Sequence, residues 1–381
     1  MKKRYKYKLR TGAAAREFLH AENDACRWVW NKCVERFKER ENTNQTTLMR
    51  LLTGWRKENE WLSAQSVVSQ QQAIRDFVKA RNQFFEKKRG APKFKSAKKS
   101  LVSLNYTTRG FSVGKDENKR LRLPRGIKIP VIWSRELPSV PSSVRVYQDA
   151  AGWWWASFVV EVKDKIKPRG GDNTVGIDLG VKTPATTTDG NNLEYSARAR
   201  ESQRDLAKQQ RRMSLHRESQ DWDAYRKAKT RSAKIQRKLR WQRKEQSRAW
   251  AQSIARENKY IACEDFKPRF LAKTHMARKA AENATTMVKQ ELETAAQSFG
   301  STFILVNPKY TTMDCSICGA RAKQRLGLDI RVYECDSCKA VLDRDVNAAR
   351  NMILRAGFNP TDDYDIRPRE TVAVQSGIPR L

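Results

Sequence analysis

Residues 333 to 352 read YECDSCKAVLDRDVNAARNM, and this stretch decides how the second half of the chain is interpreted. A cysteine pair, Cys335 and Cys338, runs within a few residues into two acids, Asp343 and Asp345, and a helical pattern follows at once. The close spacing raises two questions: what the cysteines bind, and which of the two acids takes part in chemistry.

The cysteine pair has an upstream partner of the same spacing. Cys315 and Cys318 form a first C-x-x-C pair, and 16 residues separate it from the second. Two such pairs can supply four thiolates to one tetrahedral Zn²⁺, whereas a redox role would need only one pair. A four-cysteine shell leaves no open coordination position, so we predict one structural zinc ion and a zinc ribbon over residues 311–340.

Three acids lie at element ends that could converge. Asp178 ends the apolar run TVGID, Glu264 ends the apolar run KYIACE, and Asp345 opens the helical stretch DVNAARNM. Each acid alone is more often a turn former or a helix cap. Two carboxylates on adjacent strands and one on a packed helix can instead bind a pair of Mg²⁺ ions and cleave a phosphodiester, as in RNase H-like nucleases.

Spacing alone does not choose between Asp343 and Asp345, because residues two apart share one face of an extended strand. We predict Asp345, since it stands at the mouth of the helix VNAARNMIL, whose Val346, Ala349 and Ile353 can pack on a sheet. Asp343 is then interpreted as a turn or capping residue.

The charge of the chain predicts a polyanionic partner. Its 381 residues carry 77 Lys and Arg against 42 Asp and Glu, a formal net charge of +35. Such an excess opposes compaction unless nucleic acid neutralises it. No apolar stretch of membrane-spanning length occurs, and the N-terminus MKKRYKYKLR lacks an apolar signal core, so we expect no membrane partner.

Other residue classes narrow the chemistry further. The remaining cysteines, Cys26, Cys33 and Cys263, are scattered among apolar or helical residues, which favours a reducing compartment over a disulfide framework. Only three histidines occur, in unrelated helical contexts, and the glycine-containing segments have no P-loop signature. Histidine-based catalysis and nucleotide hydrolysis are therefore poorly supported.

Hydrophobic periodicity predicts an α+β multidomain chain. The first half begins with a basic strand at 3–9, followed by helical blocks at 13–40, 45–60 and 64–88 and a basic loop at 87–99. Short strands over 101–163 then predict a small barrel or sandwich, and the N-terminal strand is expected to complete its sheet. Of the three tryptophans 153–155, at least one should face the core, whereas base stacking by the others or by Phe94 stays open.

After a linker at 163–173, strands alternate with helices, which predicts an α/β domain. The domain begins with a buried strand, a Gly turn and a second strand that ends in a DG turn. An α-hairpin over 198–250 follows, which contains 18 Lys and Arg but only 6 Asp and Glu. A helix over 276–298 and a buried strand STFILVNP follow, and residues 357–381 are expected to form a flexible tail.

Four segments, VGIDLGVKTPATTTDG, IACEDF, VNPKYTTMDCSICG and YECDSCKAVLDRDVNAARN, resemble in this order the TnpB family of transposon-encoded proteins, also described as OrfB-type transposases with a zinc ribbon. PKFKS and the basic opening strand fit the same family. The resemblance covers residues 3 to 356. Two departures stand out: Lys339 where many members have glycine, and a loose match over FKPRFLAKTHMARKAAENATT.

The resemblance implies a fold. It consists of an N-terminal β-barrel, the wedge, interrupted by a helical recognition region, and then an RNase H-like (RuvC) nuclease domain with an inserted zinc ribbon. The implied ranges are 1–12 and 101–165 for the wedge, 13–100 for the recognition region, and 174–310 with 341–356 for the nuclease domain.

The resemblance also implies a function: an RNA-guided, Mg²⁺-dependent DNA endonuclease of a transposable element, which cuts double-stranded DNA beside a short target-adjacent motif. The catalytic and magnesium-binding acids would be Asp178, Glu264 and Asp345, and the zinc ligands the four paired cysteines. The implied partners are a guide RNA from the transposon end and target DNA, in a monomeric ribonucleoprotein of the prokaryotic cytoplasm that joins the nucleoid when bound to DNA. A nuclease-silent RNA-guided repressor, a compact type V CRISPR effector and a strand-transfer transposase are the alternatives.

Overall fold

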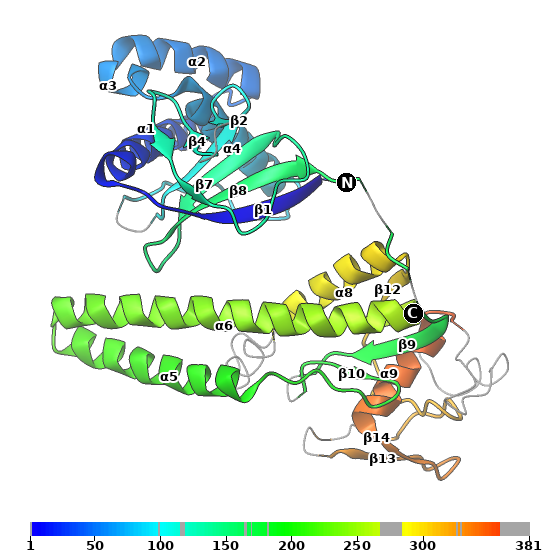
Figure 1. Ribbon diagram of the computed structural model, residues 1–381. Coiled ribbons are helices and arrows are strands. Elements are labelled where there is room, and N and C mark those ends of the chain that lie inside the picture. The colour runs from blue at the N-terminus through cyan, green and yellow to red at the C-terminus, as the bar shows by residue number, and fades with distance from the viewer. Residues whose placement is uncertain are drawn as a thin grey trace. The chain divides into compact units, whose positions relative to one another are not determined.

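The computed structural model describes residues 2–97, 100–114, 119–163, 166–168, 170–180, 183–266, 284–324, 327 and 330–358. The chain divides into two compact units, Met1–Lys163 and Asp164–Leu381, and each is described by itself (Figure 1). No helix in the described ranges is both long and apolar enough to cross a membrane. Almost all of the predicted tail, from residue 359 onward, lies outside the described residues.

An antiparallel five-stranded sheet with the order β2-β7-β8-β1-β6 forms the centre of the first unit. Strand β1 from the N-terminus pairs with β8, so that Lys2 faces Glu161 and Lys8 faces Trp155. The prediction that the N-terminal strand completes this sheet is therefore confirmed. The strands are β1 (Lys2–Leu9), β2 (Ser103–Thr107), β6 (Val131–Ile132), β7 (Ser143–Gln148) and β8 (Trp154–Glu161).

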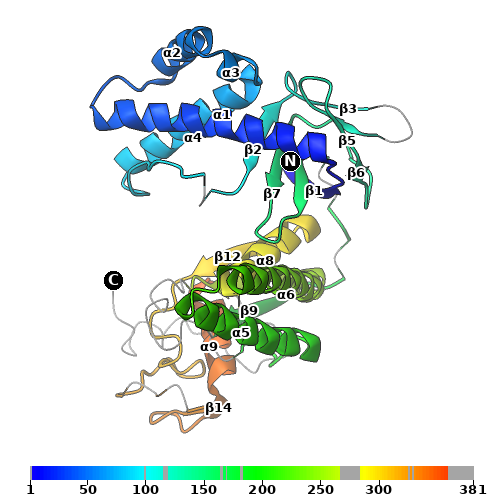
Figure 2. The ribbon, with the colours of Figure 1, turned by 90° about the vertical axis from the view of Figure 1, so that its left-hand side faces the viewer.

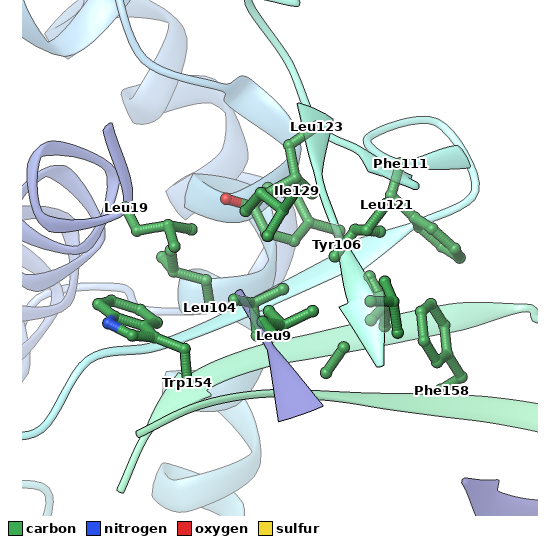
Figure 3. Packing of buried hydrophobic residues seen from close by; sticks show 14 of the residues in the cluster. Leu9, Leu19, Leu104, Tyr106, Phe111, Leu121, Leu123, Ile129, Trp154 and Phe158 are labelled. Atoms are coloured by element: carbon green, nitrogen blue, oxygen red, sulfur yellow. The ribbon is translucent and has the colours of Figure 1, made fainter. Parts of the chain in front are cut away.

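A smaller antiparallel sheet covers the inner face of the five-stranded sheet. It has the order β3-β4-β5 and comprises β3 (Ser112–Val113), β4 (Leu121–Arg122) and β5 (Lys128–Ile129). Side chains of both sheets meet in one apolar core, in which Leu121 and Ile129 lie near Leu104 and Leu9 (Figure 3). Period-two alternation sends Trp154 into this core with 3% of its surface exposed, as predicted for one of the three tryptophans.

Four helices are inserted between β1 and β2. They are α1 (Ala13–Lys38), α2 (Gln45–Glu58), α3 (Glu60–Ser63) and α4 (Val67–Phe85) (Figure 2). Three of them, α1, α2 and α4, confirm the helical blocks predicted at 13–40, 45–60 and 64–88, whereas the short α3 was not predicted. The helices enclose a second core that includes Val29, Leu48 and Phe77.

A buried carboxylate ties the first of these helices to the last. The Glu22 side chain of α1 accepts hydrogen bonds from the Ser66 amide at 2.8 Å and the Ser69 hydroxyl at 3.1 Å, at the start of α4.

A four-stranded sheet with the order β10-β9-β11-β12 forms the centre of the second unit. Strands β9 (Asn173–Asp178), β11 (Asn258–Glu264) and β12 (Thr302–Val306) are parallel, and β10 (Thr186–Thr187) is antiparallel to β9. The sequence predicts a buried strand over STFILVNP, and residues 302–306 do form a strand, but the predicted burial is wrong for most of its length. Only Val306 is buried, because β12 is the outermost strand of the described sheet and has one neighbour.

Helices lie on both faces of this sheet. On one face, α6 (Trp222–Glu257) and α8 (Thr285–Phe299) pack on Val175, Ile177 and Ile261. On the other face lies α9 (Arg344–Arg355), over the small residues Gly176 and Ala262. The predicted α-hairpin is confirmed, because α5 (Ala197–Glu218) runs beside α6 (Figure 1). Residues 276–283 of the predicted helix 276–298 lie outside the described residues.

Gly176 is required by the packing of α9 on β9. A Cβ atom at this position would lie 1.8 Å from the Ala349 carbonyl oxygen, far inside van der Waals contact. The absence of a side chain therefore brings the helix backbone directly against the strand. This contact sets the distance of Asp345, four residues before Ala349, from the strand that ends in Asp178.

Candidate metal centres

The four paired cysteines gather into one cluster. Their Sγ atoms all lie within 4.8 Å of one another, with 3.7 Å between Cys315 and Cys338 and 3.4 Å between Cys318 and Cys335. Thiolates bound to zinc at about 2.3 Å in a tetrahedron are about 3.8 Å apart. The cluster therefore fits one structural Zn²⁺, as the spacing predicted.

The two cysteine loops have the same backbone. In each, the first cysteine carbonyl accepts a hydrogen bond from the residue after the second cysteine, Gly319 in one loop at 2.8 Å and Lys339 in the other at 2.9 Å. Both of these residues have left-handed backbone, with φ of 75° and 59°. Glycine adopts this conformation without strain, whereas a lysine pays for its Cβ, so the departure at Lys339 carries a local cost.

The first cysteine loop is fastened to α9 by two asparagines one helical turn apart. Asn347 accepts from the Ser316 amide at 2.8 Å and donates to the Asp314 carbonyl at 2.9 Å, and Asn351 donates to the same carbonyl at 2.6 Å. The first cysteine loop and Asp345 are therefore held by one helix. This contact gives the short spacing between cysteines and acids a physical basis.

A buried ion-pair network lies under the same loop. The Asp314 carboxylate, with 3% of its side chain exposed, accepts from Arg321 Nε at 2.6 Å and from Arg355 at 2.6 Å. Arg321 also lies over the Tyr310 ring at 3.9 Å. An acid next to the first zinc ligand was visible in the sequence, but its partners 7 and 41 residues away were not.

Asp178 and Glu264 meet at the carboxyl ends of β9 and β11. The parallel register places Cys263 beside Ile177, so the two acids follow one another across the sheet. Both are buried, with exposed fractions of 8% and 6%. The Asp178 carboxyl donates a hydrogen bond to Glu264, and the Leu179 amide donates to Glu264 Oε2 at 3.0 Å.

Burial next to a like charge perturbs both carboxyls. Burial and then the neighbouring Glu264 and Asp345 carboxylates raise the pKa of Asp178 well above its ordinary value. Burial likewise raises the pKa of Glu264 to about 7, against the lowering effect of the Leu179 amide. Burial beside a like charge therefore favours a protonated form of this pair.

The N-terminal cap of α9 distinguishes the roles of Asp343 and Asp345. Asp343 Oδ1 accepts from the amides of Asp345 at 2.9 Å and Val346 at 3.0 Å, which makes it the N-cap that the sequence predicted. The charge of Asp345 helps to raise the pKa of Asp178, but its carboxylate contacts the Arg331 guanidinium, whose Nη1 lies 3.0 Å from Oδ2. No local pattern pointed to Arg331, which lies 14 residues upstream of Asp345.

Within the described ranges, only the cysteines draw three or more ligand atoms close enough to hold a metal. Asp178 lies near both Glu264 and Asp345, but the three acids do not form such a cluster, and Asp345 contacts Arg331 instead. Their hard carboxylate oxygens suit Mg²⁺, and the proton that burial favours on the strand acids is the one that a cation would displace.

The first unit contains a polar cavity of about 470 Å³ lined by cations, which are Arg4, Arg27, Lys79, Lys95 and Arg145. The PKFKS loop forms part of its wall and is fixed to α1, because Asn31 exchanges hydrogen bonds with the Lys95 backbone. Burial lowers the pKa of Lys95. Phe94 in the same loop is 51% exposed, and its role in base stacking stays a prediction.

Comparison with known proteins identifies the fold and then the family. The chain matches the profile of the Cas12f1-like TNB domain over residues 286–352, that of the probable transposase OrfB_IS605 over 157–274, and that of the OrfB_IS605 helix-turn-helix domain over 1–46. A cryo-EM structure of a Cas12f1–sgRNA–target DNA complex superposes with a TM-score of 0.55 at 15% identity, over 90% of this chain and 83% of the other. The fold is thus that of Cas12f1.

Two curated relatives extend over nearly the whole chain. A Streptomyces pristinaespiralis protein, provisionally named an RNA-guided DNA endonuclease, is 32% identical over 93% of this chain and 92% of its own length. The Escherichia coli K12 protein InsQ, provisionally named in the same way, is 25% identical over the same shares. The chain belongs to the TnpB family of IS605 OrfB-type proteins, as its motifs predicted.

Proposed function

We propose that the protein is an RNA-guided, Mg²⁺-dependent endonuclease that cleaves double-stranded DNA beside a short target-adjacent motif and is associated with a transposable element. The observation that carries the proposal is the pair of buried carboxyls at the ends of β9 and β11, with Asp345 on α9 close to them. The names of the two long relatives and the net charge of +35 support the same activity.

We assign the regions of the fold accordingly. The five-stranded and three-stranded sheets are the wedge barrel, the four inserted helices are the recognition region, and the sheet of β9–β12 with α9 is the RuvC-like nuclease domain. These assignments correspond to residues 1–12 and 101–165, 13–100, and 174–310 with 341–356. The segment 311–340 is the zinc ribbon, and its four cysteines hold one structural Zn²⁺.

Asp178, Glu264 and Asp345 are the proposed catalytic acids and the proposed ligands of two Mg²⁺ ions. Bound Mg²⁺ would supply an activated water and neutralise the charge of the phosphodiester. The strand acids must release the proton that burial favours before Mg²⁺ can bind. Asp345 must give up its contact with Arg331 to coordinate the ion. The Leu179 amide keeps Glu264 oriented through this change, since its hydrogen bond favours the charged form.

Cleavage of a target plasmid by the purified ribonucleoprotein tests the assignment. We expect Asp178→Ala to abolish guided cleavage while guide RNA binding is retained, and chelation of Mg²⁺ to have the same effect on the unaltered protein. The matched control is Asp172→Asn, at the exposed opposite end of β9, which should cleave normally. Guided cleavage by the Asp178→Ala protein would refute the role of the acids.

The alternatives make different predictions for the same preparation. A nuclease-silent RNA-guided repressor would bind target DNA without Mg²⁺-dependent cleavage, although all three acids are present. A compact type V CRISPR effector would copurify with RNA from a repeat array, whereas a TnpB protein copurifies with RNA from the 3′ flank of its own gene. A strand-transfer transposase would yield joined DNA products.

Metal analysis tests the ribbon separately. About one zinc per chain is expected, and replacement of Cys318 by serine should release it. A zinc-free protein with an unchanged melting temperature would contradict the proposal.

A further inference from the structure

The outer face of the five-stranded sheet carries a row of aromatic rings, which neither metal centre uses. Trp153 and Trp155 lie on this face, on either side of the buried Trp154. Their rings stack with centroids 6.4 Å apart and planes 20° from parallel. Tyr147 of β7 stands directly opposite Trp155 in the strand register and extends the row. We call Tyr147, Trp153 and Trp155 the aromatic row.

Cations from two strands lie over the same rings. Lys8 Nζ is 3.1 Å from the Trp153 centroid, and Lys6 Nζ is 4.1 Å from that of Trp155. Arg145 lies 5.9 Å from the ring of Tyr147. Alternation along β1 explains the arrangement, because its even-numbered residues are basic and share the outer face, whereas Tyr7 and Leu9 enter the core.

One aspartate contacts both tryptophans, the indole of Trp155 and the backbone of Trp153. Asp149 Oδ2 accepts from Trp155 Nε1 at 2.9 Å, and Asp149 Oδ1 accepts from the Trp153 amide at 2.9 Å. The turn between β7 and β8 is closed by the same residue, through the Ala151 amide at 2.9 Å. The rings are therefore positioned before any ligand arrives, which reduces the ordering cost of binding.

We propose that the aromatic row binds unpaired RNA, with bases stacked on Trp153 and Trp155 and phosphates bound by Lys6, Lys8 and Arg145. Aromatic rings on a sheet face bind unstacked bases in this way, and flanking cations follow the phosphate backbone. A protein of net charge +35 attracts a polyanion to this face. The inference rests on the proposed function, which supplies the RNA: a segment of the guide RNA outside its target-pairing region.

The row favours a single strand over a duplex. Bases inside a double helix are stacked on each other and present only edges and phosphates, so they cannot lie against the indole faces. In the proposed reaction the target DNA enters as a duplex and then pairs with the guide. The unpaired parts of the guide RNA are single-stranded before the target is opened, whereas the displaced DNA strand becomes single only afterwards, so the guide RNA is the strand that the rings meet first.

The first measurement is photo-crosslinking of the full-length protein to a 12-nucleotide oligouridylate that contains 4-thiouridine. We expect crosslinked peptides from residues 143–161. The variant W153L/W155L should lose these crosslinks, and W153F/W155F, which keeps two rings, should retain them. The matched control is W222L/W241L, which removes two exposed tryptophans from the α5–α6 hairpin and should leave the crosslinks unchanged.

The second measurement is the affinity for the same RNA by fluorescence anisotropy. Stacking of a base on an aromatic side chain corresponds to about 5- to 150-fold in affinity, so W153L/W155L should bind at least about fivefold more weakly. The variant K6Q/K8Q should reduce the slope of log K against log salt by about 1.4, since two phosphate contacts are lost. A thermal melt of each variant checks that it is folded.

Three results would overturn the proposal: no crosslink within residues 143–161, equal affinity of W153L/W155L and the unaltered protein, or an equal loss in W222L/W241L. Ring-dependent binding of a 12-nucleotide oligothymidylate that matches or exceeds binding of the RNA would reject RNA in favour of single-stranded DNA. If the unaltered protein does not cleave guided targets, the proposed nuclease activity is refuted, whereas these RNA-binding results still stand. The two proposals can therefore fail separately.

Discussion

We expect Gly176→Ala to displace α9, the helix that carries Asp345, while every proposed catalytic residue stays in the chain. The added Cβ would lie 1.8 Å from the Ala349 carbonyl oxygen, 2.8 Å from its carbonyl carbon and 3.1 Å from Ile353 Cγ1. Two of these atoms are backbone and cannot rotate away. Ordinary contact begins at 3.4 Å, so α9 must withdraw from β9 by about 1.6 Å, the difference from 1.8 Å.

This displacement should lower both the free energy of unfolding and the rate of guided cleavage. Overpacking of a well-packed contact lowers the free energy of unfolding by about 1–3 kcal/mol. Asp345 begins the same helix one turn before Ala349 and is carried away from Asp178. Misplacement of a catalytic group by about 1 Å lowers the rate by about 100-fold, so we expect a loss of at least this size in guided cleavage.

Urea unfolding and single-turnover cleavage of a guided target measure the two effects, and a filter-binding assay shows whether guide RNA is still bound. Gly54→Ala is the matched control, because a Cβ in this α2 position meets no atom within 4 Å. It should raise the free energy of unfolding by about 0.5–1 kcal/mol and leave cleavage unchanged. Unaltered stability and cleavage in Gly176→Ala would show that this contact does not position Asp345.

Three further predictions concern single residues of the second unit. Asp345→Asn should abolish guided cleavage, whereas Asp343→Asn should keep it, because asparagine is an equally good N-cap; loss of cleavage in both would refute the assignment. Lys339→Gly should raise the melting temperature of the zinc-loaded protein by removing about 1 kcal/mol of left-handed strain, and Gly319→Ala should lower it; the reverse order would contradict the role of φ. Glu264, with its pKa raised to about 7, stabilises the metal-free fold fully below about pH 4.5 and loses this contribution as the pH rises through 7. The metal-free protein should therefore melt at a lower temperature at about pH 8 than at about pH 5, and an equal difference in Glu264→Gln would exclude this residue as the cause.

Local patterns in the sequence were sufficient to predict most helices and the cysteine cluster. Helical periodicity predicted α1, α2, α4 and the α5–α6 hairpin, because each helix buries one apolar stripe whose spacing is visible in the chain. The C-x-x-C spacing predicted the cysteine cluster, since each pair must reach one metal within a single loop.

Contacts between distant residues could not be predicted in the same way. The N-cap role of Asp343 followed from local geometry, but the pairing of Asp345 with Arg331 depends on where β13 (Val332–Glu334) meets β14 (Val341–Asp343). The partial exposure of β12 likewise depends on its place at the end of the sheet order. Neither property is contained in the composition of the segment itself.

The sequence by itself determined the residue types: four cysteines for a soft metal, three acids for a hard one, and an excess of cations for a polyanion. Only the tertiary structure decided that burial raises the pKa values of Asp178 and Glu264, that asparagines of α9 fasten the first cysteine loop beside Asp345, and that Trp153 and Trp155 lie on the outer face under lysines. The reason is physical. Ligand chemistry depends on the side chain, which the sequence states, whereas pKa values, packing and access depend on neighbours that only the fold brings together.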